Sequence, residues 1–192
     1  QGILTTTGLN KTITGNIGSS TSLDLNTLNI GSDTDATNYS ITTINGNVFA
    51  NSTVLNNNGT TNSSELILAS GKNITSTITT ADANMGILIL AGGTQTVTGT
   101  VGGVGASLEK VSSGATGATS TFVNNVYANT VENTGTGSTT FQDNVTATNV
   151  KVNAGTSTFQ DNLSATTTTI TTGIGNFNTV SGTTTSNLQF TN

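Results

Sequence analysis

Phenylalanine recurs at a nearly constant interval in the second half of the chain. Successive steps of about 18 residues separate four of them, namely Phe122, Phe141, Phe159 and Phe177. The first three of these residues each begin a similar seven-residue segment, or heptad: FVNNVYA at 122–128, FQDNVTA at 141–147 and FQDNLSA at 159–165. A fourth copy, INGNVFA, lies upstream at 44–50. A unit this short cannot bury its own apolar face, so successive copies have to stack on one another.

Each heptad has Asn at its fourth position, which gives Asn47, Asn125, Asn144 and Asn162. If every copy forms one coil, equivalent residues lie about 4.8 Å apart along a common axis and the strands pair in parallel. The Phe residues at 122, 141 and 159 then form one interior column. We expect the Asn residues at 125, 144 and 162 to form a structural ladder and not to line a binding groove, because buried amides need hydrogen-bond partners.

A longer repeat supports the same architecture, since residues 2–18 resemble residues 86–102 at an offset of 84. Ile, Val and Thr, whose β-branched side chains favour extended backbone, dominate the strand-forming residues. We therefore predict an all-β chain folded as a parallel β-helix, or β-solenoid, with coils of about 18–22 residues. Residues 1–192 are expected to form a single solenoid segment.

The composition argues against most chemistry. The chain has no His and no Cys, so the common nucleophile and base pairs, disulfides and imidazole or thiolate metal sites cannot form. Its cations are four lysines, which are too few for a surface that neutralises phosphates, and no apolar run is long enough for a membrane helix. We expect no enzymatic activity, no cofactor, no nucleic-acid partner and no membrane insertion of this segment.

Two acidic pairs are the remaining candidates for chemistry. Asp143 and Asp161 occupy the same position in successive heptads, where stacking would bring two carboxylates about 5 Å apart, the separation used by retaining glycosidases. We interpret them as solvated surface residues. Asp33 and Asp35 resemble the start of a calcium loop, but Gly and Glu are missing from its sixth and twelfth positions. They are weak calcium candidates, and an irregular loop is favoured there.

Two stretches carry a family resemblance. KTITGNIGSSTSLDLNTLNIG, from Lys11, and NITSTITTADANMGILILAGGTQTVTGTVGG, from Asn73, resemble the passenger region of rickettsial autotransporter surface antigens, the outer membrane protein B and surface cell antigen family. This resemblance implies export to the bacterial cell surface, a parallel β-helical passenger, and a role in host-cell adhesion or in a protective surface layer. It assigns no binding residue to this chain.

The leading functional hypothesis is an extracellular structural protein of the bacterial cell surface, an adhesin or a surface-layer stalk that meets the host-cell surface. The alternative is a self-assembling filament whose solenoid ends stack head to tail, because neither terminus carries a charged or Pro-bearing cap. No basic and apolar leader precedes Gln1, so we expect an excerpt or a processed product. Ice binding is the third hypothesis. It is disfavoured because ranks of Thr-x-Thr at one fixed place in every coil are missing.

Overall fold

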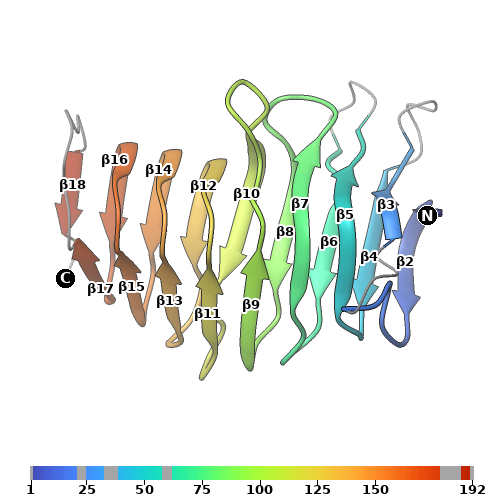
Figure 1. Cartoon of the computed structure of the whole chain (residues 1–192). Coiled ribbons are helices and arrows are strands. Elements are labelled where there is room, and N and C mark those ends of the chain that lie inside the picture. Colours follow the sequence, from blue (N-terminus) through green and yellow to red (C-terminus); the bar gives the residue numbers. More distant parts are fainter. Residues whose placement is uncertain (1, 21–24, 33–38, 58–61, 178–186, 191–192) are drawn as a thin grey trace.

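The computed structural model describes residues 2–20, 25–32, 39–57, 62–177 and 187–190 as a stack of parallel β-strands (Figure 1). Every regular element in this part of the chain is a strand. The odd-numbered strands are β1 (Ile3–Thr6), β3 (Leu25–Ile30), β5 (Val48–Leu55), β7 (Ile74–Thr80), β9 (Thr94–Thr98), β11 (Thr119–Phe122), β13 (Ser138–Phe141), β15 (Thr156–Phe159) and β17 (Ile174–Phe177). The even-numbered strands are β2 (Gly8–Ile13), β4 (Ser40–Ile44), β6 (Glu65–Leu68), β8 (Met85–Leu90), β10 (Leu108–Ser113), β12 (Val126–Asn133), β14 (Val145–Val152), β16 (Leu163–Ile170) and β18 (Asn187–Phe190).

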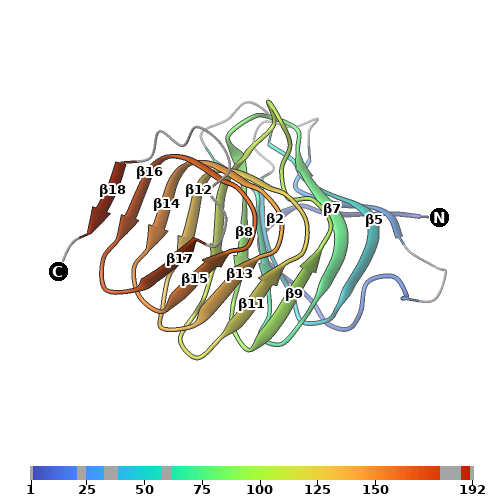
Figure 2. The same cartoon turned by 60° about the vertical axis from the view of Figure 1, so that its left-hand side comes forward.

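The strands form two nine-stranded sheets in which each strand pairs with the next one but one along the chain. One sheet runs from β1 to β17 through the odd-numbered strands, and the other from β2 to β18 through the even-numbered ones. All of these pairings are parallel, so the chain returns to the same place once per coil (Figure 2). The predicted parallel β-solenoid is confirmed.

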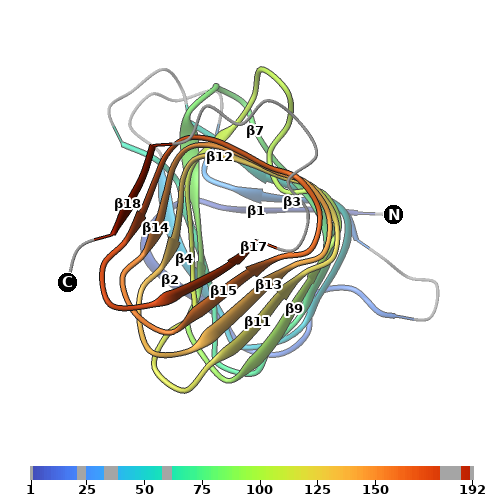
Figure 3. The same cartoon turned by 90° about the vertical axis from the view of Figure 1, so that its left-hand side faces the viewer.

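Viewed along its axis, the solenoid has three walls (Figure 3). The first wall consists of β9, β11, β13, β15 and β17. The second consists of β1, β3, β5 and β7, and bridges from Ile78 to Val101 and from Val101 to Val126 continue it into the first halves of β12, β14 and β16. The third consists of β2, β4, β6, β8, β10, the second halves of β12, β14 and β16, and β18.

The core is built of columns that run along the axis. Alternate residues of most strands point inward within a wall. In β14, which turns a corner, Val145 and Ala147 are buried before the corner and Val150 and Val152 after it. The strand register places similar residues side by side in successive coils: Val126 pairs with Val145, and Val145 pairs with Leu163. Apolar burial therefore accumulates coil by coil, and each coil is stabilised by its two neighbours.

Coil length differs between the two halves of the solenoid. The predicted length holds in the C-terminal half, where Val131 pairs with Val150 in the next coil. Coils of the N-terminal half are several residues longer, because Leu28 pairs with Thr53. The difference lies at the corner between the second and third walls, where β14 passes without a break but residues 81–84 separate β7 from β8. The loop that follows β7 rises above the strands there (Figure 1).

Register corrects the predicted equivalence of the heptad at 44–50. Val48, and not Ile44, continues the phenylalanine column, since Val48 pairs with Ile74, Ile74 with Val97 and Val97 with Phe122. Ile44 pairs with Leu68, in a column of the third wall. The heptad at 44–50 therefore lies one corner earlier in the coil than those at 122–128, 141–147 and 159–165. The heptads are similar because the solenoid has the same kind of corner sequence at two different corners of the coil.

The resemblance between residues 2–18 and 86–102 is likewise not a structural equivalence. Residues 8–13 form β2 of the third wall, whereas their counterparts at 92–97 lead into and form most of β9 in the first wall. What the two segments share is local conformation. Gly18 and Gly102 have φ values of +72° and +70°, and each packs against the backbone of the following coil.

Candidate functional site

The phenylalanine column lies inside the solenoid, at the end of the first wall. Rings of Phe122 and Phe141 stack with centroids 5.0 Å apart and planes at 11°. Phe141 and Phe159 stack at 5.0 Å and 9°, and Phe159 and Phe177 at 5.4 Å and 6°. The first three rings are buried. Their spacing follows from the strand pairing, which places Phe141 directly beside both Phe122 and Phe159.

The asparagine ladder lies at the corner between the first and second walls. Nδ2 of Asn144 donates to Oδ1 of Asn125 at 3.1 Å, and Nδ2 of Asn162 donates to Oδ1 of Asn144 at 3.0 Å. Asn144 and Asn162 thus each donate a hydrogen bond to the coil before it. Backbone bonds reinforce the corner, since the N–H of Val126 donates to the carbonyl of Asn144 at 2.9 Å. The ladder holds three coils in register.

A second asparagine ladder, which sequence reasoning missed, lies at the corner between the third and first walls. Oδ1 of Asn16 accepts from the backbone N–H of Asn47 at 2.8 Å, and Oδ1 of Asn47 from that of Asn73 at 2.8 Å. Oδ1 of Asn73 accepts from the N–H of Thr96 at 2.7 Å. Asn47 therefore belongs to this ladder and not to that of Asn125. The signal was an Asn before each of Ile17, Val48 and Ile74.

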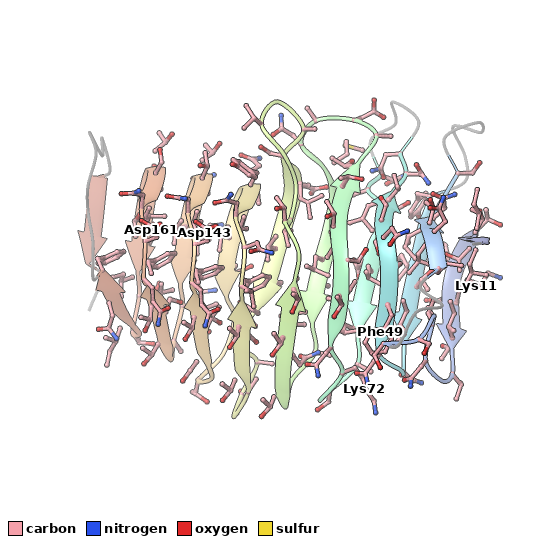
Figure 4. The ribbon with its side chains drawn as sticks, in the orientation of Figure 1. Lys11, Phe49, Lys72, Asp143 and Asp161 are labelled. Atoms are coloured by element: carbon pink, nitrogen blue, oxygen red, sulfur yellow. The ribbon has the colours of Figure 1, made fainter. Side chains whose placement is uncertain are left out.

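The carboxylates of Asp143 and Asp161 support the first ladder. Oδ1 of Asp143 accepts from the backbone N–H and from Nδ2 of Asn144, at 2.8 and 2.7 Å. Oδ1 of Asp161 accepts from the backbone N–H of Asn162 at 2.9 Å. Both residues are half-buried on neighbouring coils (Figure 4). Each carboxylate therefore orients the asparagine at the corner that follows it.

The calcium candidates Asp33 and Asp35 lie outside the described residues. Among the residues that the structure describes, no cluster of three or more acidic side chains is placed to hold a metal ion.

A small group of charges lies on the outer face of the third wall. Nζ of Lys110 forms an ion pair with Oε2 of Glu132 at 2.7 Å, and Nδ2 of Asn153 donates to Oε1 of Glu132 at 2.6 Å. Burial opposes ionisation of Glu132, but these hydrogen bonds and the charges of Lys110 and Lys151 outweigh it and lower its pKa. Burial raises the pKa of Glu65, and Lys110 offsets this in part.

A shallow depression of about 270 Å³ opens on the second wall near its corner with the first. Its lining is uncharged and mixes polar with small residues: Ala50, Asn51, Thr75, Ser76, Thr77, Thr98, Gly99 and Asn124. A site of this kind offers hydroxyl and amide groups for hydrogen bonding but no acid, base or nucleophile that is activated.

The first wall carries ranks of Thr-x-Thr on four successive strands, although, as expected from the sequence, they do not recur in every coil: Ile174 and Asn176 occupy these positions in β17. We call the outer face of β9, β11, β13 and β15 the threonine wall. Its outward residues form two columns, one of Thr94, Thr119, Ser138 and Thr156 and the other of Thr96, Thr121, Thr140 and Thr158. The inward residues between them are also polar, namely Gln95, Ser120, Thr139 and Ser157. This polar interior hid the pattern, because no apolar residue marked the inward face.

No helix within the described ranges combines the length and the apolar character needed to span a membrane. Comparison of the chain with protein-family models finds no match, and neither the curated proteins nor the solved structures yield one.

Proposed function

We propose that this chain is a structural segment of an extracellular bacterial surface protein, an adhesin or surface-layer stalk that presents its walls to a host cell. The continuous stack of coils carries the proposal. Phenylalanine rings stack from coil to coil with centroids 5.0 Å apart, and asparagine amides of successive coils are joined by hydrogen bonds of 3.0–3.1 Å, so the side chains reinforce the axis that the backbone sets.

Such a stack suits a presenting role for a physical reason. Each coil advances the axis by about 4.8 Å, so length is added while the same three walls continue. The outward residues are mainly Thr, Asn and Ser, and they form hydrogen-bonding faces that extend over many coils. The resemblance to rickettsial surface antigens supports the same location.

Bead adhesion tests this proposal. Beads coated with the chain are expected to attach to cultured host cells in greater numbers than beads coated with an unrelated β-solenoid of equal length. Free chain in solution should compete the attachment away. Equal attachment of the two solenoids would remove the adhesive role and leave only a stalk.

Exposure at the two ends of the described stack favours a filament as the second candidate. Leu4 is 36% exposed although its column partner Leu28 is buried, and Phe177 is half-buried although Phe159 is buried. A further coil, supplied by the same chain or by a second copy, would cover these side chains. Electron microscopy at high protein concentration distinguishes the candidates, because discrete short rods alone would contradict head-to-tail stacking.

A further inference from the structure

The threonine wall carries a regular two-dimensional array of hydroxyl groups. Thr119 pairs with Thr94 and with Ser138, and Thr121 pairs with Thr96 and with Thr140. Neighbours within a column are therefore about 4.8 Å apart, and the two columns are about 6.6 Å apart along the strands. No register shift interrupts β9, β11, β13 and β15, so the array has one repeat in each direction.

The array rests on a rigid support. Phe122, Phe141 and Phe159 are the inward residues at the ends of β11, β13 and β15, and their stacked rings hold these strands from below. Threonine adds stiffness of its own, because its branched Cβ restricts rotation about χ1. The hydroxyl and methyl groups on the outer face therefore keep fixed positions with respect to one another.

The hydroxyls of this array face water. Thr94, Thr119 and Ser138 are exposed, and Thr96, Thr121, Thr140, Thr156 and Thr158 are half-exposed. Within the described part of the chain, the one hydrogen bond to a hydroxyl group of the array is that of Asn176 Nδ2 to Thr158 Oγ1, at 3.4 Å. The other hydroxyl groups are left to bind water, and water bound to them inherits the repeat of the strands.

Charge is absent from the threonine wall but present elsewhere on the solenoid. Strands β9, β11, β13 and β15 contain no Asp, Glu, Lys or Arg. The third wall, by contrast, carries Glu65, Lys110, Glu132 and Lys151. An ion orients water radially and disturbs a tetrahedral water network, whereas neutral hydroxyl and methyl groups can be incorporated into one.

We propose that the threonine wall binds the surface of ice crystals through an ordered layer of water. Waters held between neighbouring hydroxyl groups occupy positions repeated in two directions, as waters do in a crystal face. The adjacent methyl groups favour the cage-like arrangement of water around apolar groups. This binding activity goes beyond the proposed adhesive role and depends on a different wall of the molecule.

Thermal hysteresis of the full chain tests the inference. The protein is expected to separate the freezing point of a seeded solution from its melting point and to shape the growing crystal into facets. The double substitution Thr121→Lys and Thr140→Lys places two charges at the centre of the array. It should abolish both effects, because the charges disturb the ordered water. The fold should persist, because both side chains point outward.

The matched control is Thr146→Lys with Ser164→Lys. These two exposed residues are register partners on the second wall and carry the same change in charge. The control should retain the hysteresis and faceting of the parent, and urea unfolding should show that both double variants are folded. A parent that freezes at its melting point with rounded crystals would overturn the inference, as would equal loss of hysteresis in the two double variants.

Discussion

The ring of Phe141 lies almost flat against that of Phe159, with centroids 5.0 Å apart and planes at 9°. Since Phe122 stacks on its other face at 5.0 Å, Phe141 is the middle ring of three buried ones. The backbone register of β13 with its two neighbours imposes this contact, and the contact in turn fills the end of the first wall. The two levels of structure stabilise the same coil.

Phe141→Ala should therefore lower the free energy of unfolding by about 3–5 kcal/mol, because a buried ring is replaced by a cavity. Urea unfolding measures the loss, and hydrogen exchange should show weakened protection in β11, β13 and β15, since each coil depends on its neighbours. Phe49→Ala is the control, because Phe49 is only half-buried, on the outer side of β5. Equal losses in the two variants would contradict the central role of the stack.

The hydrogen-bond ladder makes a separate prediction at Asn144. Its amide donates to Asn125 and Asp143 and accepts from Asn162, so Asn144→Ala leaves three polar groups without this partner. The expected cost is about 1–2 kcal/mol, reduced by partial access of water. Asn149→Ala on the same strand is the control, since no side-chain hydrogen bond of Asn149 to a described residue is present. A larger loss for Asn149→Ala in urea unfolding would argue against the ladder.

Sequence reasoning succeeded where one residue type marks one place in the coil. The interval between phenylalanines was sufficient to predict the solenoid, because only stacked coils align them. It failed where the solenoid uses one pattern at two corners, so that Asn47 was grouped with Asn125 although the two belong to different ladders. It also missed the threonine wall, whose ranks are confined to four strands. There the inward Ser120 and Thr139 are polar as well, and the alternation that normally identifies a strand disappears.

Stability should depend on pH with opposite signs at two glutamates of the third wall. The pKa of Glu132 is lowered from 4.5, so its contribution to stability is present above that pH and is lost as the pH falls through the folded-state pKa. The pKa of Glu65 is raised from 4.5, so ionisation of Glu65 destabilises the fold as the pH rises through its folded-state pKa.

Glu132→Gln should therefore destabilise the protein at pH 7, by roughly 0.2–1 kcal/mol because the ion pair with Lys110 is partly exposed. Glu65→Gln should leave stability at pH 7 equal or slightly higher. Thermal melts between pH 3 and pH 7 are the measurement, with each variant serving as the control for the other. Destabilisation of the same sign and size in both variants would show that their environments do not differ in the way described.

The close stacking of backbone at the corner between the third and first walls is tested at Gly155. Its φ is +68°, and a Cβ placed there would lie 2.1 Å from the carbonyl oxygen of Gly137 in the preceding coil. Gly117 has a similar φ of +72°, but a Cβ there would meet nothing within 4 Å. Gly117→Ala should cost about 1–2 kcal/mol from backbone strain alone. Gly155→Ala adds a displacement of the backbone, so its loss in urea unfolding should exceed that of Gly117→Ala; equal losses would mean that the coils can separate at this corner without cost.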